Sequence, residues 1–116
     1  MRIYGVSQSS GVERRLHIEQ GGEGVLLTIS DHVGNVKRAD IMVHPDSLLA
    51  AIIDRTPGGV TIEGRSQPHE PKKVIDIEIR RNEVLLRVRA ESQSESDVAV
   101  GLDDFQDALE GVLNQG

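Results

Sequence analysis

Hydrophobic and polar residues alternate along most of the chain with a period of two. The clearest runs span residues 25–30, 75–80 and 84–89, where every second residue is Val, Leu or Ile. Such alternation is typical of strands that bury one face and leave the other mostly polar. Short breakers such as Gly21-Gly22 and Arg81-Asn82 separate the runs. The pattern predicts eight strands, at residues 2–7, 12–19, 24–31, 36–43, 59–64, 73–80, 83–90 and 96–101.

Two segments have the spacing of amphipathic helices instead. Apolar residues recur at helical intervals at Leu48, Leu49, Ile52 and Ile53, and again at Phe105, Ala108, Leu109, Val112 and Leu113. Pro45 suits a first helical turn, and the acids that follow place negative charge at the positive end of the helix dipole. We therefore expect helices at residues 46–55 and 103–114, with Phe105, Leu109 and Val112 buried.

The same order of elements occurs twice. Aligned with itself at a displacement of 59, the chain pairs residues 3–5 with 62–64, 16–19 with 75–78 and 25–27 with 84–86; from residue 40 the displacement is 57. This regularity favours an internal duplication. The sequence thus predicts one α+β domain with two ββββα repeats, residues 1–57 and 58–116. We expect two antiparallel four-stranded sheets packed around two helices with pseudo-two-fold symmetry.

The junction where a strand runs through His44-Pro45-Asp46 into a helix resembles that of the positive-cofactor-type transcriptional coactivators. The tandem ββββα arrangement is similar to the Whirly proteins, which bind single-stranded DNA. The resemblance implies single-stranded DNA binding and a role in transcription regulation. The lysine-rich stretch of the Whirly proteins does not occur here, so the resemblance identifies no binding residue.

The composition excludes several kinds of chemistry. Among the 116 residues there is no cysteine, which rules out disulfides, thiolate zinc sites and a cysteine nucleophile. Tyr4 and Phe105 are the two aromatic residues. The chain therefore offers few side chains that could stack on a base. No apolar run reaches the length of a signal peptide core or a membrane span. We expect a soluble, cytoplasmic protein without membrane association.

The negative charge is concentrated near the C-terminus. The chain has a formal net charge of −6, and residues 91–116 hold seven acids and no Lys or Arg, which leaves a net +1 for residues 1–90. A low overall pI weakens a nucleic-acid interpretation without excluding it.

One face of the second half could bind phosphates. Arg80, Arg87 and Arg89 share the polar face of two predicted strands, but Asp76 and Glu78 lie on the same face. Cross-strand ion pairing is therefore the alternative explanation. On the first half, Tyr4 could stack on a base, or could simply cover the edge of a sheet. The candidate nucleic-acid-binding residues are Arg80, Arg87, Arg89, Lys72, Lys73, Arg2, Arg15 and Tyr4.

No pattern indicates catalysis or a cofactor. The four histidines, His17, His32, His44 and His69, lie in different elements, and we expect His44 at a helix entrance. The glycine-rich segments lack the Lys-Ser/Thr of a phosphate-binding loop, and no serine lies in a Gly-x-Ser-x-Gly motif. We expect a non-enzymatic protein with no catalytic residue, metal or cofactor.

Two functions remain open. The first is a module that binds single-stranded DNA or RNA or is associated with transcription. The second is a protein-interaction or assembly module without nucleic acid, for which apolar residues on polar strand faces, namely Leu26, Met42 and Leu85, could supply a surface. A protein partner and an oligomer are both compatible with the sequence.

Overall fold

The computed structural model describes all residues except 23, 68, 91–92 and 115–116, and no side chains are described for residues 93–95. Ten elements follow one another in the chain. They are β1 (Arg2–Val6), β2 (Glu13–Gln20), β3 (Val25–Asp31), β4 (Lys37–Val43), α1 (Pro45–Asp54), β5 (Val60–Gly64), β6 (Lys73–Arg80), β7 (Glu83–Ala90), β8 (Gln93–Gly101) and α2 (Leu102–Leu113). Their order agrees with the predicted order, and β8 has the largest boundary difference because it begins at Gln93 instead of residue 96.

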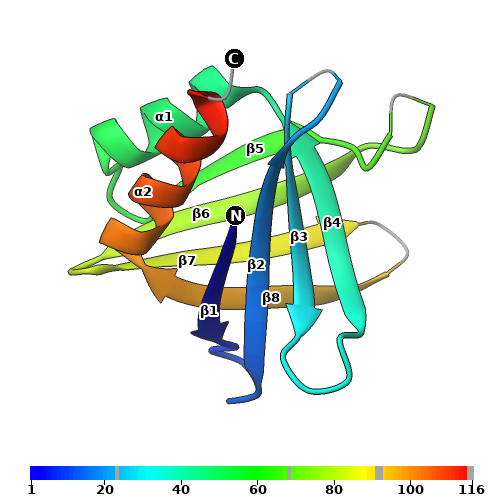
Figure 1. Cartoon of the computed structure of the whole chain (residues 1–116). Coiled ribbons are helices and arrows are strands. Elements are labelled where there is room, and N and C mark those ends of the chain that lie inside the picture. Colours follow the sequence, from blue (N-terminus) through cyan, green and yellow to red (C-terminus); the bar gives the residue numbers. More distant parts are fainter. Residues whose placement is uncertain (23, 68, 91–92, 115–116) are drawn as a thin grey trace.

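The predicted arrangement of these elements is wrong. All eight strands form one antiparallel sheet in the order β4-β3-β2-β1-β8-β7-β6-β5 (Figure 1). Val6 of β1 pairs with Ala99 of β8, which we call the first seam. Met42 of β4 bridges Arg65, directly after β5, which we call the second seam. The sheet is therefore a nearly closed barrel, and not two four-stranded sheets of a duplicated ββββα fold around two helices.

A glycine lies at each seam. Gly5 is placed so that an added Cβ would overlap the carbonyl oxygen of Ala99, and an added Cβ at Gly64 would overlap that of Met42. A missing side chain lets two backbones approach closely. The strand ends can therefore meet across each seam. Alternation along a strand does not reveal this long-range approach, which is why the sequence pattern suggested two separate sheets.

One hydrophobic core fills the barrel. Leu16, Leu27, Ile75 and Leu86 point inward from the strands, and Phe105 of α2 is fully buried with them. The burial expected for Phe105, Leu109 and Val112 is confirmed.

The two helices pack against different parts of the barrel. Helix α2 contacts β1 and β2 on one side and β7 and β8 on the other, so it covers the first seam. Helix α1 connects β4 to β5 and buries Leu48, Ala51 and Ile52. The His44 ring caps α1, because its Nδ1 accepts a hydrogen bond from the Asp46 N–H at 3.1 Å. The expected place of His44 at a helix entrance is confirmed.

Candidate functional site

Two arginines of the second half, Arg80 and Arg89, lie in ion pairs with acids of the same sheet. Arg80 Nε donates to Glu78 Oε1 at 2.8 Å, and Arg89 Nε donates to Asp76 Oδ2 at 2.6 Å. Partial burial would raise the pKa of Asp76, but hydrogen bonds from Arg89 and Thr61 outweigh it, and the positive charge of Arg87 adds to them, so that pKa is lowered. Arg89 and Asp76 form the predicted kind of cross-strand pair, whereas Arg80 and Glu78 pair within β6.

The two lysines near the start of β6, Lys72 and Lys73, have different surroundings. Lys72 Nζ is 3.7 Å from Glu63 Oε2 on an exposed edge. Lys73 points instead into the second seam, where its Nζ lies 3.1 Å from Asp40 Oδ1 and donates to the Ser66 hydroxyl. Ser66 in turn donates to Asp40. Lys73, Asp40 and Ser66 form what we call the second clasp.

A similar group, the first clasp, holds the first seam. Asp97 Oδ1 accepts hydrogen bonds from the Ser7 and Ser9 hydroxyls at 2.7 Å, and its Oδ2 accepts one from the Gln8 N–H at 2.8 Å. Arg14 Nη1 donates to the Asp97 carbonyl oxygen at 2.8 Å. In each clasp an acid from the last strand of one half meets two residues of the other half. These are a serine just after the first strand and a cation of the second strand. These buried polar groups bind one another, which indicates a structural role.

The clasps keep their carboxylates ionised. Burial raises the pKa of Asp97, but hydrogen bonds from Ser7 and Ser9 and from the backbone outweigh it, so the pKa lies below its ordinary value. Burial likewise raises the pKa of Asp40, and the hydrogen bonds from Ser66 and Lys73 again lower it overall.

The outer face of the first half is different. Arg2 pairs in register with His17, and Tyr4 pairs with Arg15, so four outward side chains of β1 and β2 are neighbours. They adjoin a small hollow of about 170 Å³ that we call the cradle, whose described lining is Arg2, Arg15, His17, Thr28, Ser30 and Asn35. None of these six residues is acidic. No ion pair joins Arg2 or Arg15 to a carboxylate within the described part of the chain.

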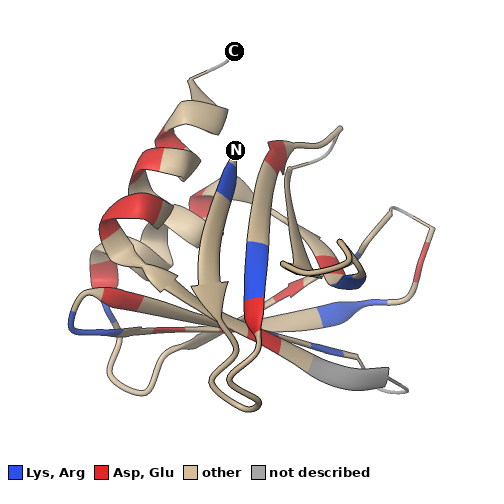
Figure 2. Ribbon diagram, turned by 60° about the horizontal axis from the view of Figure 1, so that its bottom comes forward, with Lys and Arg blue, Asp and Glu red and all other residues tan. Residues whose placement is uncertain are grey.

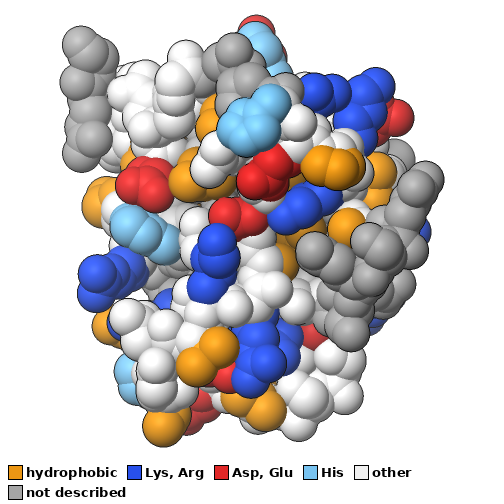
Figure 3. Space-filling model, turned by 90° about the vertical axis from the view of Figure 1, so that its right-hand side faces the viewer, with side chains coloured by type: hydrophobic (Ala, Val, Ile, Leu, Met, Phe, Trp, Pro, Cys, Tyr) orange, Lys and Arg blue, Asp and Glu red, His pale blue; other side chains and the backbone are white. Residues whose placement is uncertain are grey.

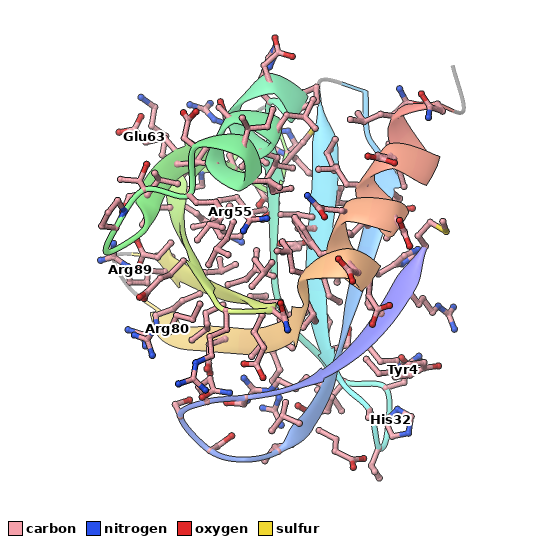
Figure 4. The ribbon with its side chains drawn as sticks, turned by 90° about the vertical axis from the view of Figure 1, so that its left-hand side faces the viewer. Tyr4, His32, Arg55, Glu63, Arg80 and Arg89 are labelled. Atoms are coloured by element: carbon pink, nitrogen blue, oxygen red, sulfur yellow. The ribbon has the colours of Figure 1, made fainter. Side chains whose placement is uncertain are left out.

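Tyr4 marks the border of a second hollow. Its ring meets the His32 ring edge-on, with centroids 5.2 Å apart and planes at 87°. Both rings line an open depression of about 350 Å³ together with Gly5, Val6, Glu13 and Arg14. Figure 4 shows Tyr4 and His32 on the opposite side of the molecule from Arg80 and Arg89. The candidate residues therefore separate into two surfaces.

Exposed apolar residues gather beside this depression. Of the seven large hydrophobic residues that are exposed in the described chain, five lie on β1, the β1–β2 loop and the β3–β4 loop. Both loops are at the lower end of the barrel in Figure 1. Val33 is the most exposed, at 82 %. We call this group the valine rim: Tyr4, Val6, Val12, Val33 and Val36.

Backbone contacts connect the members of the valine rim. The His32 N–H donates to the Glu13 carbonyl at 3.0 Å, which brings the β3–β4 loop against the start of β2. The Ser7 N–H donates to the Val12 carbonyl at 2.9 Å. The sequence pattern missed this surface, because Val33 fell in the segment between two predicted strands and Val36 was predicted to begin the second of them. The residues it named instead, Leu26, Met42 and Leu85, are partly buried.

Charges elsewhere are mixed. Lys and Arg side chains are interspersed with Asp and Glu on the face shown in Figure 3, and acidic residues mark the ribbon of α2 in Figure 2. Among the residues that the structure describes, no three His, Asp or Glu side chains are grouped as metal ligands would be. The described helices are all too short or too polar to span a membrane.

Comparison of the chain with family models, curated proteins and solved structures found no match. The resemblance to the Whirly proteins therefore stays a prediction.

Proposed function

We propose that the chain is a non-catalytic protein-binding module of the cytoplasm whose partner docks on the valine rim. The observation that supports this is the clustering of exposed apolar side chains at one end of the first half. Scattered apolar residues are normal on a protein surface, whereas a contiguous group marks an interaction site. The depression beside Tyr4 and His32 offers space for an apolar side chain of the partner.

The valine rim can contribute apolar contact energy to docking. Burial of apolar surface contributes about 25 cal/mol per Å², so one covered valine adds up to about 1.5 kcal/mol to binding. Val33 and Val36 flank a tight turn in which Gly34 and Asn35 have positive φ angles of 82° and 54°. This turn presents both valines on a defined backbone, which lowers the entropic cost of docking.

The test is purification of the chain with its bound proteins from the organism that makes it. We compare the wild type with Val33→Ser/Val36→Ser and with the control Ile53→Ser, which alters an equally prominent apolar residue, 75 % exposed, on α1. A partner that is retained by Ile53→Ser and lost by the rim variant supports the proposal. Retention of every bound protein by the rim variant contradicts it, and so does the absence of any stoichiometric partner.

A second candidate function is binding of single-stranded nucleic acid on the outer face of β1 and β2. The observation that favours it is the placement of Arg2 and Arg15, which lack carboxylate partners among the described residues, beside Tyr4, whose side chain is 60 % exposed. Phosphates would contact the guanidinium groups and one base would stack on the tyrosine ring.

Fluorescence anisotropy with labelled single-stranded DNA and RNA tests this candidate. Arg2→Gln/Arg15→Gln should weaken binding and reduce the slope of log affinity against log salt by up to about 1.4, at roughly 0.7 per lost phosphate contact. The control Arg87→Gln/Arg89→Gln removes two charges from the other surface and should leave both quantities unchanged. Equal losses in the two variants would contradict the assignment to the first half.

A further inference from the structure

We infer that the cradle is a binding site for a phosphate group, an inference that does not rest on the proposed protein-binding function. Its side chains come from three adjacent strands and one turn. Arg2 of β1 faces His17 of β2, which in turn faces Thr28 of β3. Arg15 of β2 faces Ser30 of β3, and Asn35 lies in the turn that follows. The sheet register therefore fixes where most of these groups lie.

The side chains of the cradle are all able to donate hydrogen bonds. They supply two guanidinium groups, an imidazole, two hydroxyls and an amide. An Arg15 terminal nitrogen donates to Asn35 Oδ1, which orients the Asn35 NH₂ group away from Arg15 and keeps it available as a donor. Arg15 Nε is buried without a hydrogen-bond partner among the described residues. An acceptor from outside the chain, either water or a bound anion, can satisfy these donors.

The charge and geometry favour phosphate over a carboxylate. Two guanidinium groups that form no ion pair with a described carboxylate attract a doubly charged anion more than a singly charged one. A carboxylate has two oxygens in one plane, whereas phosphate presents oxygens tetrahedrally and can accept from donors on several strands at once. Guanidinium groups also bind phosphate oxygens through paired hydrogen bonds. The hollow of about 170 Å³ has room for one such group.

The exposed ring of Tyr4 indicates what carries the phosphate. Tyr4 lies directly across from Arg15 in the β1–β2 register, so an aromatic group attached to a phosphate on the cradle could reach the tyrosine ring. The ligand class is therefore a phosphate ester with a flat aromatic group, as in a nucleoside monophosphate.

The experiment is a two-dimensional ¹H–¹⁵N NMR titration of the intact chain with inorganic phosphate, with sodium chloride holding the ionic strength constant. We expect saturable shifts confined to β1, β2, β3 and the β3–β4 turn. Acetate should bind more weakly than phosphate. A purine nucleoside monophosphate should bind more tightly than phosphoserine, and it should shift the Tyr4 amide more than inorganic phosphate does.

Variants make the result specific. Arg15→Gln should weaken phosphate binding at least about tenfold, because a hydrogen bond to a charged group is worth about 1.5–3 kcal/mol. Arg2→Gln, at an exposed position, provides the same test with little risk to the fold. The control Arg87→Gln should retain wild-type affinity. Shifts that are unsaturable or spread over the whole chain overturn the inference, as does unchanged affinity in both cradle variants. Phosphate binding without oligonucleotide binding supports the cradle and removes only the nucleic-acid candidate.

Discussion

On β6 and β7, Arg80 and Arg89 each pair with a carboxylate of the same sheet, whereas on β1 and β2 neither Arg2 nor Arg15 has such a partner among the described residues. The two faces have the same kind of side chain in the same kind of strand. In β6 the acids Asp76 and Glu78 form these pairs, whereas the acids of β2, Glu13 and Glu19, form no ion pair with Arg2 or Arg15 among the described residues. An arginine indicates a binding surface only when its neighbours leave its charge uncompensated.

The seams, in contrast, are alike. Gly5 and Gly64 admit the backbone of the opposite strand, and a clasp of acid, serine and cation lies next to each. The halves therefore share the features that close the barrel and differ in the features that face a ligand. This separation predicts that substitutions at the seams affect stability in both halves, whereas substitutions on the outer faces affect binding in only one.

The largest effect is expected in the common core. Leu109 of α2 and Leu48 of α1 are both fully buried. Replacing either by Ala should lower the free energy of unfolding by roughly 2–5 kcal/mol, because a cavity is left behind. Chemical denaturation measures the loss. A loss below about 0.5 kcal/mol would show that the helix does not contribute to the core.

The next largest loss of stability is expected from substitutions at the seams. Gly5→Ala and Gly64→Ala each force a methyl group against a backbone carbonyl of the opposite strand, which should destabilise by about 1–3 kcal/mol. Gly22→Ala is the matched control, because nothing lies within 4 Å of its added Cβ. If thermal unfolding shows the same stability for Gly64→Ala as for the control, the second seam is not closed as described.

The clasps allow a finer comparison. Asp97→Asn should cost about 1–3 kcal/mol, since the buried Ser7 hydroxyl and the partly buried donors of Gln8 and Ser9 would lose a charged acceptor. Asp40→Asn should cost less, because the Asp40 side chain is 18 % exposed against 9 % for Asp97. Urea titration of the two variants ranks them. A larger loss at Asp40 would reverse our assignment of the stronger clasp.

The pH dependence follows from the same carboxylates. The pKa values of Asp97 and Asp40 in the folded chain lie below the ordinary value of 3.8, so the unfolded chain binds protons more readily. Their contribution to stability is therefore complete above about pH 5 and is lost as the pH falls below about 4. Thermal melts from pH 3 to pH 7 should show this decline, and it should be smaller in Asp97→Asn. An identical decline in that variant would assign the acid sensitivity to other groups.

The smallest effect is expected on the paired arginine face. Arg80→Gln removes one exposed ion pair, and such pairs contribute about 0–1 kcal/mol. We expect a change of less than about 0.5 kcal/mol in the free energy of unfolding. A larger loss, measured by urea titration, would show that the outer face also helps to hold the barrel.

The sequence was sufficient to predict the ten elements because periodicity is local. It could not predict barrel closure, which depends on how Gly5 and Gly64 meet strands far away in the chain. Lys73 was predicted to bind nucleic acid for the same reason, since its partner Asp40 is 33 residues away in the sequence. The possible pairing of Arg80 and Arg89 could be foreseen because Asp76 and Glu78 lie close by in the sequence.

The valine rim and the cradle required the three-dimensional arrangement. Val33 and Val36 become a surface only when the β3–β4 loop lies against the start of β2. The cradle likewise needs the register that brings three strands together, although Arg2 and Arg15 were already candidates. Single positions could be identified from residue type, whereas their grouping could not.

The contrast between the two arginine faces can be measured most directly by NMR exchange of the arginine Nε–H protons with water. In an ion pair the Nε–H is held by a carboxylate, so the protons of Arg80 and Arg89 should exchange more slowly than that of Arg2, and added salt should accelerate them. The Arg2 proton should exchange rapidly at low and high salt alike. Equal exchange rates for Arg2, Arg80 and Arg89 at low salt would contradict the account, because the two faces would then be equally available to a ligand.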